Sequence, residues 1–203
     1  FMFAGVFGII SIVTGLGNIL GKALSLSISV LEATAKGLTA FGNALGLLET
    51  DDPVEMGIKR IQAEKAGIEP DVYDSYDEYL DAVNNFEIDE ESAAEISLEE
   101  KLLKGAQHAT EAIDRKFPDS EILNVAEGIV ENPEFYDDDR FAALAELVSN
   151  DPDKIAIIGK LLTGKLEGDE YYDAIDMIVS AEQTKHPELT IEEIEERVQK
   201  SLA

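Results

Sequence analysis

The chain has 203 residues, of which 43 are acidic and 16 are basic, and its formal net charge at pH 7 is −27. A surface with this charge repels nucleic acid, so no direct grip on DNA or RNA is expected. The chain contains no cysteine, which excludes a disulfide framework, a thiolate metal site and a cysteine nucleophile. Its length suffices for one domain or two.

The N-terminal segment differs in composition from everything that follows it. Residues 1–48 carry only three charges, Lys22, Glu32 and Lys36, and residues 1–21 carry none. A helix of 21 uncharged residues is long enough to cross a hydrocarbon layer of about 30 Å. The first residue is phenylalanine and not methionine, which indicates a processed product or part of a longer protein.

Small and weakly polar residues recur in this segment at helical spacing, and they include a GxxxG sequence typical of close helix contacts in membranes. The predicted helix-packing stripe comprises Ala4, Gly8, Ser11, Gly15, Gly17, Gly21, Ser25 and Ser29. Larger side chains on other seams are predicted to face lipid or a protein tube, namely Phe3, Phe7, Ile10, Val13, Leu20, Leu24, Leu31, Leu38 and Leu45. In water the arrangement would invert, with the large residues buried and the stripe exposed.

One long helix over residues 1–48 is the simplest interpretation, and a hairpin of two helices that bends near Gly21 and Lys22 is an alternative. Alternating apolar and polar residues between 24 and 30 would suit a strand, but Glu32 and Lys36 are ordered as a favourable pair on a helix. Apolar helices rich in glycine and alanine also occur as buried central helices of soluble bundles and as oligomerisation helices covered by other chains. A secretory signal is disfavoured because the basic residues that begin one are missing.

Signals for helix starts and ends recur throughout the rest of the chain, while strand signals are almost absent. The predicted helices cover residues 53–66, 75–85, 97–116, 120–130, 138–148, 152–162, 169–183 and 190–202. We therefore predict an all-α fold with a long apolar, glycine- and alanine-rich helical arm. The predicted division is the arm over 1–48, short helices and a linker over 49–96, and an acidic domain of several short helices over 97–203.

No group of residues has the spacing of a known catalytic or metal site. His108 and Glu111 are three residues apart, but a solvent-exposed or capping role is expected for this histidine, and neither histidine has an HExxH context. His186 precedes a proline at a helix end, where an imidazole favours the terminal carbonyls. The acidic run over residues 137–139 lacks the spacing of an EF-hand loop. We predict no enzyme activity, no metal and no cofactor.

The order of the two parts, an uncharged helical arm and then an acidic helical region, resembles the C-terminal part of a tape-measure protein of tailed phages. The sequences IQAE (residues 61–64), GIEP (67–70) and DSYDEY (74–79) are also similar to segments of phage or mobile-element proteins. The resemblance covers the architecture of the chain and implies a structural virion protein.

Tape-measure proteins occupy the tail tube in a few parallel copies, set its length, and are released at infection, when apolar segments enter the host membrane and help the genome to pass. The partners implied are copies of the chain itself, other tail-tip or tube subunits, and the host membrane. The locations implied are the virion tail and, on infection, the host cell membrane. The arm would enter the membrane, and the acidic domain would fill the tail tip.

Two other classes of protein fit the same sequence. In a pore-forming toxin or a bacteriocin-like protein, the acidic domain would keep the arm soluble until it meets a membrane. In a purely structural helical adaptor, partner subunits would cover the arm permanently.

Overall fold

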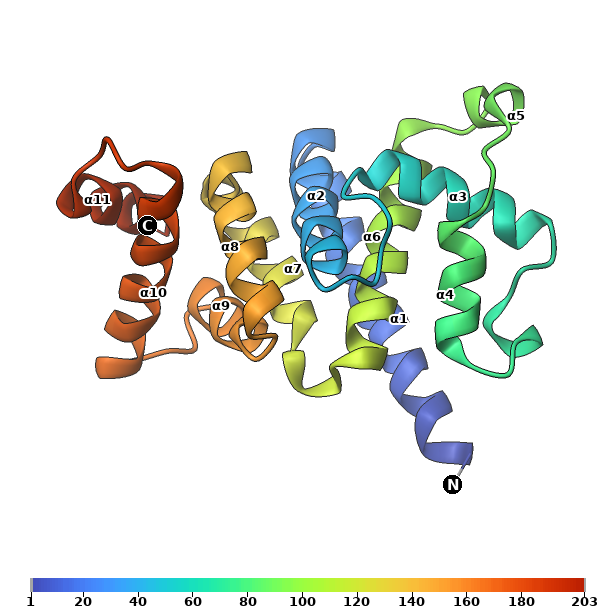
Figure 1. The fold of residues 1–203 in the computed structure, drawn as a ribbon, viewed down its shortest axis with the longest axis horizontal. Helices are drawn as coiled ribbons and strands as arrows, with labels where there is room; N and C mark the ends of the chain where they lie inside the picture. The colour runs from blue at the N-terminus through green and yellow to red at the C-terminus, as the bar shows by residue number, and fades with distance from the viewer. Residues whose placement is uncertain (1, 203) are drawn as a thin grey trace.

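The computed structural model describes the backbone of residues 2–202 and the side chains of residues 14–202. All regular secondary structure in this part of the chain is helical, as predicted (Figure 1). The α-helices are α1 (Met2–Leu26), α2 (Ile28–Ala44), α3 (Pro53–Lys65), α4 (Tyr76–Asn84), α5 (Glu90–Ala94), α6 (Leu98–Lys116), α7 (Ile122–Glu131), α8 (Asp138–Asn150), α9 (Lys154–Leu162), α10 (Asp169–Lys185) and α11 (Ile191–Ser201). Three 3-10 turns are η1 (Pro70–Val72), η2 (Pro118–Ser120) and η3 (Pro133–Phe135).

Several helix starts predicted from capping residues are confirmed, whereas the helix predicted from Ser120 begins at Ile122 after a 3-10 turn. Ser75 accepts a hydrogen bond from the third backbone N–H of α4, and Ser97 does the same for α6. Thr190 and Glu193 form a reciprocal capping box at the start of α11. These bonds satisfy N–H groups that have no partner within the helix. α5 is absent from the predicted helices because its five residues are too few to show a periodic pattern; Asp89 caps it.

Residues 1–48 do not form one helix. α1 ends just before Ser27, and α2 begins just after it. This residue has an extended backbone, with φ −170° and ψ 160°, and its hydroxyl accepts a hydrogen bond from Val30 N at 3.2 Å. The chain changes direction there (Figure 1). The two-helix alternative is therefore correct, although the break does not lie at Gly21 and Lys22, and the strand alternative is wrong.

The second helix lies in the middle of the molecule, where α2 contacts α1, α3, α6, α7 and α8 (Figure 1). Its Leu31 and Leu38 are fully buried. Gly37 allows the close approach of two neighbours, since a Cβ there would lie 2.8 Å from both Ile129 Cδ1 and Phe141 Cε1. Apart from a strip that carries the partly exposed ion pair Glu32–Lys36, α2 is apolar, and such a helix is stable only when most of its surface is enclosed. The interpretation as a buried central helix is thus correct for α2.

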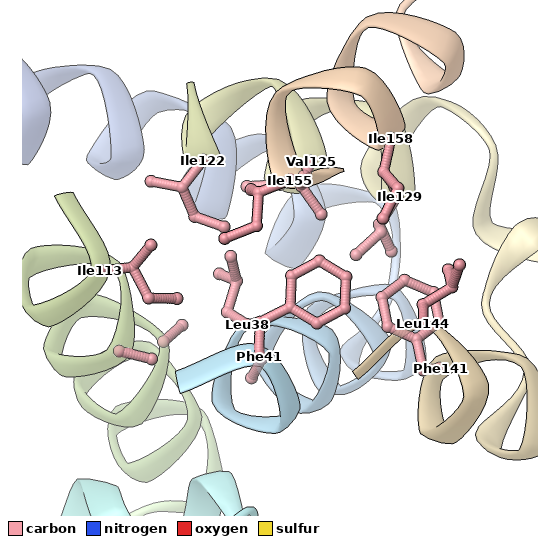
Figure 2. Close-up of a cluster of buried hydrophobic side chains, with 14 of the residues drawn as sticks. Leu38, Phe41, Ile113, Ile122, Val125, Ile129, Phe141, Leu144, Ile155 and Ile158 are labelled. Atoms are coloured by element: carbon pink, nitrogen blue, oxygen red, sulfur yellow. The ribbon is translucent and has the colours of Figure 1, made fainter. Parts of the chain in front are cut away.

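One hydrophobic core extends from α1 to α11. Figure 2 shows the region where five helices meet, with Leu38 and Phe41 from α2, Ile113 from α6, Ile122, Val125 and Ile129 from α7, Phe141 and Leu144 from α8, and Ile155 and Ile158 from α9. The rings of Phe41 and Phe141 stack with their centroids 5.6 Å apart. Because the same core includes Leu16 of α1 and Val198 of α11, the predicted boundary at residue 48 does not separate an arm from an acidic domain in residues 14–202.

α3 and α6 cross in close contact at two glycines. A Cβ on Gly57 would lie 1.8 Å from the carbonyl oxygen of Lys101, and a Cβ on Gly105 would lie 2.1 Å from that of Pro53. Both distances are far shorter than a van der Waals contact, and the atoms concerned are backbone atoms that cannot rotate away. Only glycine fits at these two positions.

We expect Gly105→Ala to lower the free energy of unfolding by about 1–3 kcal/mol or more, because α3 and α6 must move apart to admit the methyl group. The measurement is urea unfolding followed by circular dichroism. Gly21→Ala is the matched control: nothing lies within 4 Å of a Cβ there, and alanine favours a helix over glycine by up to about 1 kcal/mol. Equal effects of the two substitutions would contradict the observed crossing.

Candidate functional site

The described part of α1 has one buried face and one exposed face. Leu16, Leu20 and Ala23 are buried in the core, and α1 contacts α6 and α7. On the other side, Gly17 and Gly21 are exposed, and a Cβ added to either would meet nothing within 4 Å. From residue 14 onward, α1 therefore has the arrangement expected in water.

The positions of the predicted stripe residues follow from this arrangement. Gly17, Gly21, Ser25 and Ser29 are exposed, while Gly15 is half-buried, with a Cβ there 3.2 Å from Leu123 Cδ1. Ala4, Gly8 and Ser11 lie outside the residues whose side chains the structure describes. The described part of the stripe is thus not a packing surface within this chain, except at Gly15.

The residues predicted to face lipid or a tube divide in three ways. Leu20, Leu31 and Leu38 are buried in the chain's own core, so the prediction is wrong for them. Leu45 is half-buried against the same core, and Leu24 is exposed. Phe3, Phe7, Ile10 and Val13 lie outside the described side chains. The physical reason for the error is that the acidic helices supply an apolar interior, which takes up the residues that the sequence analysis assigned to lipid.

Large apolar side chains are exposed where α1 meets α2. The exposed fraction is 39% for Leu24, 57% for Leu26 and 37% for Ile28. Leu24 follows Gly17 and Gly21 at helical spacing, so the three share one face of α1. Gly17, Gly21 and Leu24 define what we call the outer α1 surface, whereas Leu26 points to another side of α1 and Ile28 belongs to α2. Sequence analysis missed Leu26 and Ile28, although their position in a run of alternating apolar residues gave a signal.

Charge is nearly absent from the outer α1 surface. The first acidic residue of the chain is Glu32, in α2. Lys22 lies beside the surface, and its Nζ is 3.2 Å from Glu131 Oε1 of α7. Both side chains are about half exposed, so water screens this ion pair and its contribution to stability is small.

A second candidate is a buried polar cluster between α3, α4 and α6. Arg60 donates from Nε to Glu64 Oε1 at 2.6 Å and from Nη1 to Glu111 Oε2 at 3.2 Å. The same Nη1 lies 3.0 Å from His108 Nδ1. An arginine is always protonated, so His108 Nδ1 must be the acceptor and the proton of the neutral ring must be on Nε2. Sequence analysis missed Arg60, although it is in helical phase with the buried Met56.

His108 is fully buried, so the predicted exposed or capping role is wrong. Burial, together with the neighbouring charge of Arg60, lowers the pKa of His108 to about 3. Burial also raises the pKa of the Tyr76 and Tyr79 hydroxyls. The Arg60 guanidinium lies 5.4 Å from the centroid of the Tyr79 ring, and the rings of Tyr79 and His108 are 6.1 Å apart. This cluster holds α4 against α3 and α6.

A second buried ion pair joins Arg140 of α8 to Glu182 of α10. Arg140 Nη1 also donates to Phe135 O at 2.7 Å and to Ser201 Oγ at 3.0 Å. Each polar group therefore has a partner, as buried charges require. The geometry ties α8, α10, α11 and η3 together and leaves no group free for chemistry.

Other sequence candidates have local structural roles. Asp137 caps α8 by accepting a hydrogen bond from Arg140 N. His186 ends α10, and its ring lies near carboxylates rather than terminal carbonyls, with Nδ1 3.3 Å from Glu188 Oε1 and Nε2 3.6 Å from Asp139 Oδ2. Among residues with described side chains, no group of three or more His, Asp and Glu is placed to hold a metal ion.

Two of the open grooves on the described surface are the following. One has a volume of about 440 Å³ between α9 and α10, with apolar Ile157, Leu166 and Met177 between the rim residues Lys160 and Glu170. The other has a volume of about 570 Å³ and lies between α2, α3, α6 and α8. Its lining combines charged residues, such as Glu32, Lys36 and Asp138, with alanines and the rings of Tyr136 and Phe141. Neither groove brings together a nucleophile and a base.

The depressed pKa of His108 makes stability depend on pH. In the unfolded chain this histidine binds a proton below pH 6.5, whereas in the folded chain it stays neutral down to about pH 3. Protons therefore favour unfolding in that window. Between pH 7 and pH 5 we expect the native chain to lose about 2 kcal/mol more of its unfolding free energy than His108→Gln, which cannot be protonated. Urea titrations at both pH values measure the difference, and equal losses would show that His108 is not buried as a neutral ring.

Among the residues whose side chains are described, 14–202, no helix combines the length and the apolarity needed to cross a bilayer. No family model, curated protein or solved structure matches this chain.

Proposed function

We propose that this chain is a structural protein of a phage tail and corresponds to the C-terminal region of a tape-measure protein in the tail tip. The observation that carries the proposal is the packing of α1. Its inner face is fixed in an acidic helical body through Leu16, Leu20 and Ala23. Its exposed side is free of acidic residues and combines glycines and Leu24 with weakly polar side chains such as Asn18 and Ser25. A protein built in this way offers one surface to an apolar partner and a charged surface to water.

The arm in this proposal is α1 alone, because α2 belongs to the core of the body. In Figure 1 the N-terminal end of α1 extends past α6 and α7 at the lower edge of the molecule. Residues 2–13 of this helix carry no charge. On this proposal they meet the tube or, on infection, the host membrane, and the body fills the tail tip.

The negative charge of the helices outside α1, which we call the body, is compatible with DNA moving past the protein. The chain carries a net charge of −27, and the charges that α1 lacks are concentrated on the helices that surround it. Phosphate groups are repelled by such a surface. A plug of this kind would hold its position by helix packing and would not retain the genome as it passes.

The membrane part of the proposal predicts that the purified full chain floats with phospholipid vesicles in a density gradient. Ile10→Glu should reduce the floating fraction strongly, because a carboxylate within the hydrocarbon layer costs about 2–3 kcal/mol or more. The measurement is the fraction of protein in the lipid layer after centrifugation.

The matched control is Val72→Glu, which places the same charge on an exposed residue of η1 that is 63% exposed. This variant should float like the native chain. Failure of the native chain to float, or an equal loss for both variants, would overturn the membrane part of the proposal.

A pore-forming protein is the alternative that a specific observation favours, since the body already covers one face of α1 as a soluble shield would. Release of a trapped dye separates the two functions. A pore former makes vesicles leak when the isolated chain is added, whereas a tail protein that acts with its tube subunits binds the vesicles and leaves the dye inside.

A further inference from the structure

The groove of about 570 Å³ between α2, α3, α6 and α8 has the shape of a bed for another helix. One strip of α2 lines its middle, in which Glu32, Lys36, Ala40 and Ala44 follow one another four residues apart. This strip extends about 18 Å along the helix axis. Because α2 contacts both α3 and α8, one wall is a face of α8 and the other is the chain that enters α3, with Leu102 of α6.

The groove is lined by small apolar residues that water can reach. Ala142 of α8 is exposed, and Ala40, Ala44 and Ala145 are partly exposed. Every other exposed residue of α8 is polar, so Ala142 departs from the pattern of its own helix at the groove. Alanine side chains let a second helix approach closely, and the ring of Phe141 supplies an apolar contact below them.

The two walls carry an excess of negative charge. Asp51 and Asp52 lie on the α3 side, and Asp138 lies on the α8 side. Lys36 is the only cation among the described residues that line the groove, and it is paired with Glu32 at 2.9 Å. The pKa of Lys36 is raised, first by the hydrogen bond that it donates to Glu32 and further by the charges of Glu32, Asp138 and Asp52. The negative potential of both walls therefore reaches the middle of the groove.

We propose that this groove binds a cationic helix of a different protein. The helix would place small or apolar residues against the alanines and would carry lysine or arginine on both flanks, opposite the aspartates of the two walls. A helix that lays its apolar face into a groove is a recurring mode of recognition, and opposite charges at the rim select the partner and its orientation.

The charge requirement excludes the occupants that this chain itself could supply. Residues 1–13 carry no charge, so they would leave the aspartates without cations. A second copy has a net charge of −27 and would bring mainly carboxylates to the groove. The inference goes beyond the proposed function, because it concerns the body and requires neither lipid nor α1.

The first test is the binding of a synthetic helical peptide of about 14 residues, slightly longer than the groove. It has alanines and leucines on one face and lysines on both flanks. In about 0.15 M salt, which screens distant charges, titration calorimetry with the full chain should show one peptide bound per chain. Two control peptides should not bind measurably. One has glutamate in place of lysine, and the other has the same residues in an order that gives no apolar face.

The second test uses variants of the full chain. Ala142→Trp should weaken binding at least about tenfold, because the indole occupies the groove, whereas Ser149→Trp, on an exposed part of α8 outside the groove, should not. Asp51→Lys should weaken binding about fivefold or more. Its matched control is Glu49→Lys, which makes the same change of charge at an exposed residue of the same loop outside the groove. Circular dichroism verifies that each variant is folded.

The inference fails if the lysine peptide shows no saturable binding, if either control peptide binds equally well, or if the paired variants lose binding equally. These outcomes are distinct from those of vesicle flotation. A chain that floats but does not bind the peptide loses the groove and keeps the membrane part of the proposed function, whereas a chain that binds the peptide and does not float does the reverse.

Discussion

The enclosure of α2 is the constraint on which the rest of the structure depends. Apart from one strip that carries the partly exposed ion pair Glu32–Lys36, this helix is apolar, so in water other helices must cover most of its surface. α1, α6, α7 and α8 each supply a side of that enclosure, and Gly37 lets two of them approach closely. The acidic residues of these helices are left to face outward, which explains how one chain can combine an apolar centre with a large negative charge.

Two polar ties fix the ends of the molecule around this centre. Arg60 joins α3 to α6 through Glu111 and His108, and Arg140 joins α8 to α10 and α11. A buried charge contributes little net stability, but removing one of its partners is costly. Such ties therefore favour one arrangement of the helices over others of similar apolar burial, and we attribute the defined positions of the outer helices to them.

Most helices of residues 49–203 could be predicted because their signals are local: often a serine, threonine or aspartate at the start, and glycine, asparagine or proline after the end. The environment of residues 1–48 could not, because apolar residues such as Leu31 are equally suited to lipid and to a protein interior. The Arg60 cluster was beyond reach for a different reason. Its members come from separate helices, and the spacing of residues along one helix does not show which other helix packs against it.

The early position of α2 in the chain has a consequence for synthesis. Phe41 stacks on Phe141, about 100 residues later, so α2 leaves the ribosome well before the helix that closes its far side. At roughly 5–20 residues per second, translation leaves it without that partner for about 5–20 s. During that time the nascent chain exposes the apolar face of α2, and a holding chaperone or early pairing with α1 would be needed to keep it from aggregating.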